Sequence, residues 1–179
     1  DGDEGIAEVF FDGAFLADDA IPGGVVLGDV GQGWSVAMAT TSSERGLTLR
    51  APGRFTATAD RLLELYRTHA AAPDGIDPGL RDRVVQAWME AEAYRLQTLQ
   101  TVTDDAEGRS AGAASSFVKL WWSELDVKLH ETALDILGAD AELDGPWSKG
   151  WQFALSGPIY AGTNEIQRNI AAERVLGLP

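Results

Sequence analysis

The chain has 179 residues and a mass of 19.1 kDa, which suits one domain, or one domain with a fragment of another. Its 45% hydrophobic and 23% charged residues are typical of a folded globular protein and argue against a disordered chain. With 14 basic against 28 acidic residues the net charge is −14, which makes nucleic acid and anionic membrane surfaces poor partners.

Cysteine and histidine usage excludes several kinds of site. The absence of cysteine excludes disulfides, thiol nucleophiles and cysteine-ligated zinc. The two histidines, His69 and His130, show no metal-ligand spacing, so we expect no metal site. No apolar run approaches the roughly 20 residues of a membrane span, and no signal peptide is visible, so we expect no membrane span and a cytoplasmic protein.

The first 30 residues have a strand-like pattern. Val and Phe are frequent and an Asp-Gly turn signal interrupts them, so we expect short strands around 6–11 and 14–16 and a weaker one around 25–27. Two such strands do not make a stable sheet alone. We therefore interpret residues 1–30 as the end of a middle β domain whose remainder lies upstream.

Helical periodicity begins near residue 31 and continues to the C-terminus. The expected helical segments are 31–72 with a break at Pro52, 78–107 with Asp77 as N-cap, 113–137 closed by Gly138, a short helix from 147, and 163–176. Residues 139–146 are expected to form a loop. The predicted fold is mainly α: residues 31–179 form an antiparallel four-helix-bundle-like C-terminal domain, preceded by a short β remnant.

The C-terminal string that begins at Ile159 is the most specific segment of the sequence. Within it, Gly162-Thr163 opens the last helix, and a glycine followed by a helix N-terminus can form a small anion site. Such caps are common, so these two residues alone favour an ordinary capped helix.

The string IYAGTNEIQRNI at 159–170 resembles the C-terminal signature of the acyl-CoA dehydrogenase family. Three further segments resemble the family in the same order: 10–34 its exit from the middle β domain, 43–45 (Ser-Glu-Arg) the start of its first C-terminal helix, and 115–138 the helix that leads to its flavin loop. The resemblance covers nearly the whole chain but only the back half of a family member. It implies α,β-dehydrogenation of an acyl-CoA thioester with FAD as cofactor, and a separate electron-transfer acceptor.

The resemblance also indicates where the catalytic base would be. In most members the base directly follows the tyrosine of the signature, but here Ala161 stands there and cannot take a proton. Glu165 is four residues further on, about 6 Å along a helix, which is too far for a simple replacement. A minority branch, including isovaleryl-CoA and long-chain acyl-CoA dehydrogenases, carries the base on the first helix of this domain, at the position of Glu44. Glu44 is therefore the candidate base, and a solvated helix carboxylate is its alternative.

The other site residues are also implied by the resemblance. The substrate-binding positions are Arg45, Tyr160, Ala161 and Gly162, and the cofactor-binding positions are Thr163, Glu165, Asp135 and Gly138. Glu165 suits a pyrophosphate poorly, because of its charge, unless it meets a ribose hydroxyl or the adenine. Asp135 stands where the family usually has glutamine, which weakens the flavin loop.

One family segment has no counterpart here. Most members carry Arg-x-Phe-Gly, which holds the adenosine diphosphate half of a neighbouring subunit's FAD; the region 65–70 here has no Phe-Gly, and Arg67 is a remnant or an ordinary helix arginine. Some actinobacterial members that act on steroid side chains share such losses and combine two kinds of subunit in a heterotetramer. We therefore expect a homo- or heterotetramer. A non-catalytic structural subunit that completes a partner's FAD and substrate site is the main alternative, and a plain helical interaction domain is the third.

Overall fold

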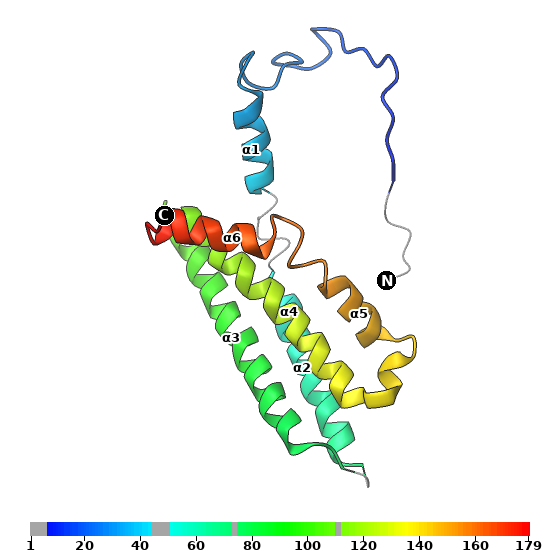
Figure 1. The fold of residues 1–179 in the computed structure, drawn as a ribbon. Helices are drawn as coiled ribbons and strands as arrows, with labels where there is room; N and C mark the ends of the chain where they lie inside the picture. Colours follow the sequence, from blue (N-terminus) through cyan, green and yellow to red (C-terminus); the bar gives the residue numbers. More distant parts are fainter. Residues whose placement is uncertain (1–6, 44–50, 73–74, 110–111) are drawn as a thin grey trace. The chain divides into compact units, whose positions relative to one another are not determined.

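The structure, a computed structural model, describes residues 7–43, 51–72, 75–109 and 112–179 (Figure 1). The chain divides into two units, one within residues 2–46 and one that comprises 47–179, and each is described by itself.

The N-terminal unit contains one helix, α1 (Gly33–Ser43), after an extended and turn-rich segment. No strand is formed within 7–32, so the strands expected around 6–11, 14–16 and 25–27 are absent from their described parts, and that prediction was wrong. A strand needs a neighbour for its backbone N–H and C=O groups, and residues 7–32 form no such pairing with one another. Their large apolar side chains are correspondingly exposed. The assignment of residues 1–30 to the end of a β domain stays a prediction.

Three long helices form the body of the second unit. They are α2 (Pro52–Ala70), α3 (Pro78–Ala106) and α4 (Ser115–Leu137), and they pack pairwise against one another. The start of α2, the start of α3 and the end of α4 lie at the residues that the sequence predicted. Pro52 starts α2, where a missing N–H is tolerated, and the Asp77 carboxylate accepts the Gly79 amide at 2.9 Å to cap α3. Gly138 ends α4 with a φ of 58°, a conformation that favours glycine.

The core of this unit lies between these three helices. Its buried apolar side chains are Phe55, Ala59 and Leu62 of α2, Leu80, Val84, Ala87, Ala91 and Tyr94 of α3, and Val118, Trp122, Leu125, Leu129, Ala133 and Ile136 of α4. The core positions of α3 and α4 follow the apolar spacing of a helix that the sequence shows. The aromatic rings pack edge to face, with the Phe55 and Tyr94 centroids 5.2 Å apart.

Shorter elements complete the unit on one side of α4. The region 139–146, expected as a loop, is partly a 3₁₀ turn, η2 (Gly138–Glu142), and the predicted short helix is α5 (Pro146–Ala154). The last helix, α6 (Asn164–Ile170), passes into a π-helical turn, η3 (Ala171–Val175), in which the Leu176 amide donates to Ala171 O at 3.0 Å. A π turn at the end of this helix was not expected.

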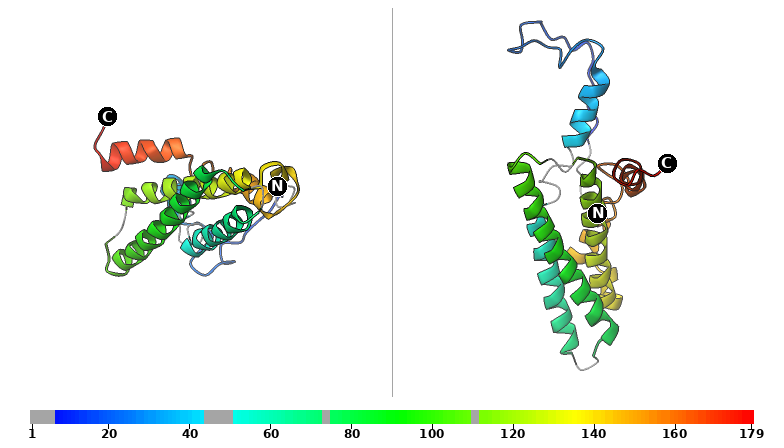
Figure 2. Two further views of the ribbon diagram at one scale, coloured as in Figure 1. Left: turned by 90° about the horizontal axis from the view of Figure 1, so that it is seen from below. Right: turned by 90° about the vertical axis from the view of Figure 1, so that its left-hand side faces the viewer.

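The views in Figure 2 agree that α2, α3 and α4 run side by side and that α6 lies beside α4. The prediction of a mainly helical, antiparallel bundle domain is confirmed. None of the described helices is long and apolar enough to cross a membrane.

Candidate functional site

The segment that joins α5 to α6 lies directly on α4. At Gly157 a Cβ would come within 3.0 Å of Ala154 O and 3.3 Å of the Trp122 ring, so a glycine permits this close approach. Further along, the Tyr160 ring packs on Trp122 with centroids 5.6 Å apart. The signature turn, which comprises residues 160–163, is therefore supported by a buried tryptophan of the core.

The signature turn has a left-handed backbone. Ala161 has a φ of 56° and Gly162 a φ of 84°, and Ala161 is the one non-glycine with a positive φ in the part of the chain that the structure describes. This conformation costs an alanine roughly 1–2 kcal/mol, so surrounding contacts must hold it. Two hydrogen bonds do so: the Gln167 side-chain amide donates to Ala161 O at 3.0 Å, and the Asn164 amide donates to Pro158 O at 2.9 Å.

The turn presents backbone donors. In the described residues, the amides of Ile159, Tyr160 and Asn164 donate to the protein's own carbonyls, whereas those of residues 161–163 donate to no protein group. Consecutive N–H groups of this kind bind a carbonyl or phosphate oxygen well. The turn is therefore suited to an oxygen acceptor.

The first turn of α6 is capped by protein groups. The Thr163 hydroxyl accepts the Ile166 amide at 3.4 Å, as the sequence predicted for this N-cap. The pKa of Glu165 is lowered, first by its own backbone amide, then by the Thr163 hydroxyl and by the charges of Arg168 and Lys119. An exposed, ionised carboxylate at this position repels a phosphate and accepts hydrogen bonds from hydroxyl groups.

A polar layer joins α4 to α6 beneath the turn. Lys119 and Asn164 are 2% and 4% exposed, and the Lys119 ammonium donates to Asn164 Oδ1 at 2.6 Å. The Ser123 hydroxyl donates to the same oxygen at 3.1 Å. Sequence reasoning missed these residues, although a lysine on the apolar stripe of the helix that carries Val118 and Trp122 was a signal that could have found them.

The structure does not gather all of the predicted site residues. Glu44 and Arg45 lie outside the described residues. Asp135 is exposed and pairs with Arg83 at 2.5 Å, and it lies about 24 Å along α4 from Lys119 at 1.5 Å per residue. Asp135 and Gly138 are thus remote from the signature turn of the same chain. Arg67 is exposed and lies 3.8 Å from Glu64, which is the geometry of an ordinary helix arginine.

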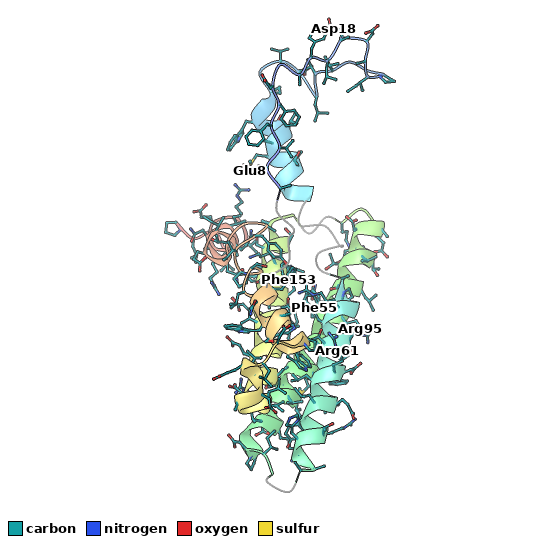
Figure 3. The ribbon with its side chains drawn as sticks, turned by 90° about the vertical axis from the view of Figure 1, so that its right-hand side faces the viewer. Glu8, Asp18, Phe55, Arg61, Arg95 and Phe153 are labelled. Carbon is teal, nitrogen blue, oxygen red and sulfur yellow. The ribbon has the colours of Figure 1, made fainter. Side chains whose placement is uncertain are left out.

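A second buried polar group lies between α2, α4 and α5. Asp126, which is 1% exposed, forms an ion pair with Arg54 and lies 3.4 Å from His130 Nδ1. Figure 3 shows Phe55 and Phe153 near each other where α5 meets α2, and the Arg54 guanidinium lies over both rings, 5.4 and 5.1 Å from their centroids. Asp126 is buried and Arg54 lies over two aromatic rings that pack beside it, so we assign this group to packing.

Comparisons with known proteins agree with this geometry. Residues 31–176 match the family described as "Acyl-CoA dehydrogenase, C-terminal domain". The chain is 38% identical over 185 aligned positions to "Acyl-CoA dehydrogenase IpdE1" of Mycolicibacterium smegmatis, an alignment that covers 99% of this chain and 44% of that protein. It is 40% identical over 179 positions to the protein of the same name from Mycobacterium tuberculosis, covering 96% of this chain and 44% of that protein.

Solved structures share the fold. The "Tcur3481-Tcur3483 steroid ACAD" superposes with a TM-score of 0.70 at 21% identity, covering 82% of this chain and 40% of that one. The chain therefore belongs to the acyl-CoA dehydrogenase family, whose members are flavoprotein oxidoreductases, and it corresponds to the helical C-terminal domain. It spans about 44% of the length of the two IpdE1 relatives.

Proposed function

We propose that the chain is the C-terminal part of an FAD-dependent acyl-CoA dehydrogenase that removes hydrogen from the α and β carbons of an acyl-CoA thioester. The observation that carries the proposal is the signature turn, in which the amides of residues 161–163 have no acceptor among the residues that the structure describes. Family membership and two relatives named acyl-CoA dehydrogenase support the same chemistry.

The residues present fit FAD at the start of α6. The backbone amides of the turn would donate hydrogen bonds to an oxygen of the cofactor, and the ionised Glu165 carboxylate suits a ribose or ribityl hydroxyl better than the pyrophosphate. Bound FAD would supply the acceptor for the β-hydrogen, which leaves as hydride. Asp135 and Gly138, at the far end of α4, would serve another part of a cofactor or another subunit's cofactor.

The turn would also act on the substrate. Hydrogen bonds from the amides of Ala161 and Gly162 to the thioester oxygen would stabilise the negative charge that develops when the α-proton leaves. Tyr160, held on Trp122, would form one wall of the acyl site. The small side chain of Ala161 leaves room beside that wall for a bulky acyl group.

The proton acceptor in this proposal is Glu44. Ala161 carries no basic group, and Glu44 stands at the position used by the branch of the family that places its base on the first helix of this domain. Its carboxylate would take the α-proton, and desolvation in the closed site would raise its basicity towards that of the forming enolate. The neighbouring Arg45 would contact the acyl-CoA.

The substrate class and the assembly belong to the same proposal. A structural relative is described as a steroid ACAD with a two-protein name, Tcur3481-Tcur3483. Together with the IpdE1 relatives, this similarity favours a polycyclic, steroid-derived acyl-CoA and an assembly of more than one subunit. An electron-transfer acceptor would reoxidise the enzyme.

The proposal is tested by anaerobic stopped-flow reduction of the full-length, FAD-loaded protein with steroid-derived acyl-CoA thioesters. Glu44→Gln should slow flavin reduction by roughly 10²–10⁴-fold while FAD stays bound, because it removes the basic lone pair and keeps the side-chain shape. The matched control is Glu64→Gln, an exposed glutamate on α2, which should reduce flavin at the wild-type rate. In the Glu44→Gln background, Ala161→Glu should restore part of the activity. An unchanged rate in Glu44→Gln would reject Glu44 as the base.

A non-catalytic subunit is the second candidate. The alanine at the usual base position and the Asp135–Arg83 pair in the last turn of α4, where the family usually has glutamine, favour it. In that case the full-length protein should co-purify with a catalytic partner, with fewer flavins than chains. Flavin absorbance against chain stoichiometry distinguishes the two candidates.

A further inference from the structure

The signature turn is tied to the core of the bundle through a single buried cation. Lys119 is 2% exposed, and burial of an ammonium is unfavourable unless polar groups surround it. Its Nζ donates to Asn164 Oδ1 at 2.6 Å and lies 5.9 Å from the centroid of the Trp122 ring. A buried charge of this kind fixes the position of the group that it contacts.

Asn164 connects Lys119 to the signature turn. Its side-chain oxygen accepts from Lys119 and Ser123 on α4, while its backbone amide donates to Pro158 O at 2.9 Å. One residue therefore joins α4 to the segment that enters the turn and to the helix that leaves it. The next turn of α6 adds Gln167, fully buried, whose side-chain amide holds Ala161 O.

These contacts surround the one strained alanine in the described residues. The left-handed conformation of Ala161 persists only where surrounding contacts hold it, and the hydrogen bonds from Asn164 and Gln167 enclose it on both sides. Removing the cation would leave the Asn164 side chain with only the longer hydrogen bonds from Ser123, at 3.1 Å, and to Glu124, at 3.3 Å, and would loosen its position. The turn would then relax towards ordinary backbone angles and move its amides.

We propose that Lys119 is a positioning residue: through Asn164 it holds Ala161 and Gly162 in the left-handed geometry that directs their amides to the substrate. The expected effect of Lys119 on the reaction rests on the proposed function. Its expected effect on the conformation of the turn rests on the hydrogen bonds alone. Lys119 itself need not contact the acyl-CoA.

The experiment compares Lys119→Met, Lys119→Arg and Lys128→Met in the full-length protein. Lys128 is the matched control, because it lies on the same helix but is 45% exposed and pairs with Glu90 at 2.7 Å. Lys119→Met should slow flavin reduction by acyl-CoA roughly 10- to 100-fold, because small displacements of reacting groups have effects of that size. Its affinity for acyl-CoA should change less, Lys119→Arg should recover part of the rate, and Lys128→Met should match the wild type.

Hydrogen exchange measured by mass spectrometry gives a readout that is independent of activity. Lys119→Met should raise exchange in the peptide over 158–167 while α2 and α3 stay protected, and Lys128→Met should not. A double-mutant cycle adds Ala161→Gly, because glycine adopts the left-handed region readily. If Lys119 acts by holding that conformation, Lys119→Met should slow reduction far less in the Ala161→Gly background.

The outcomes separate the two proposals. A Lys119→Met variant with the wild-type rate of flavin reduction and wild-type hydrogen exchange would overturn the inference. It would also be overturned if Lys119→Met slowed reduction equally with Ala161 and with Gly at position 161 and raised exchange throughout the bundle, because Lys119 would then act by packing alone. If Lys119→Met does not fold, Asn164→Ala replaces it, and we expect the same slower flavin reduction and the same raised exchange over 158–167. A wild-type protein that shows no flavin reduction contradicts the proposed function instead, and the exchange of 158–167 then decides the inference.

Discussion

Glu165 illustrates how local contacts set the charge of one residue at the start of α6. Its own backbone amide and the Thr163 hydroxyl favour the ionised form, which lowers its pKa. A carboxylate with a lowered pKa contributes stability that is present above the unfolded-state value, about 4.3, and is lost as the pH falls through the folded value. The contribution of Glu165 is therefore complete at neutral pH and disappears only in acid.

We predict that Thr163→Val raises the pKa of Glu165 towards the ordinary glutamate range, because it removes the second-largest cause of the shift and keeps the side-chain shape. NMR titration of the glutamate side-chain carbons, assigned with Glu165→Gln, measures it. Thr68→Val, on α2, is the control because the Thr68 hydroxyl bonds only within its own helix, to Glu64 O. No change in the titration of Glu165 in Thr163→Val would contradict the proposed contact.

Position 150 needs a glycine because the neighbouring His130 ring leaves no room for a side chain, and not because of its backbone conformation. A Cβ at this position would lie 2.6 Å from Cδ2 of His130, whose ring packs against Trp147 with centroids 5.6 Å apart. We therefore predict that Gly150→Ala destabilises the protein by about 1–3 kcal/mol, in spite of the better helix propensity of alanine. Gly53→Ala, with open space around its Cβ, should be neutral or stabilising in the same urea unfolding experiment. Equal stability of the two variants would show that α5 can shift away from His130.

At the scale of elements, the Asp126–Arg54 pair connects α4 to α2. Asp126 is buried, whereas the Arg54 side chain is 35% exposed and can be rehydrated when its partner is lost. We predict that Asp126→Ala lowers the free energy of unfolding by about 2–3 kcal/mol, below the range for a fully buried pair. Asp135→Ala, which breaks the exposed Arg83 pair, should cost less than about 1 kcal/mol. Urea unfolding of the full-length variants gives both values, and a smaller loss for Asp126→Ala than for Asp135→Ala would contradict the assignment.

At the scale of the whole molecule, α3 has two apolar faces. Its inner face forms the core, while the opposite face exposes an apolar stripe whose members are Val85, Met89, Leu96 and Leu99. The tryptophans of α4 pack inward, with Trp122 only 3% exposed, whereas Ile166 on α6 is half exposed. A stripe of this size is unusual on a monomer and favours burial against another subunit.

We predict that Leu96→Glu combined with Leu99→Glu weakens the assembly of the full-length protein. Each buried leucine contributes about 1.5–3 kcal/mol, so the dissociation constant should rise by roughly a hundredfold or more. Gln97→Glu adds one negative charge beside the stripe, against two in the double variant, and should leave the assembly intact. Sedimentation velocity over a range of protein concentrations measures both. Unchanged assembly in the double variant would place the interface elsewhere on the protein.

The sequence by itself determined the helices and singled out the turn on which the proposed site rests. Helix ends follow from local chemistry, such as the Asp77 cap, the proline at 52 and the glycine at 138, so they could be predicted without the fold. The string at 159–170 identified the turn because its residues are contiguous.

Only the tertiary structure decided which residues support that turn, and whether the N-terminal residues form strands. Lys119 and Asn164 are 45 positions apart, and nothing in either local pattern indicates that an ammonium and an amide share one buried layer. Residues 7–32 have a strand-like sequence but find no partner strand in the described part of the chain, because the periodicity of a strand is local whereas its hydrogen bonds are not. Long-range pairing of polar groups is a property of packing, and packing is decided only when the helices come together.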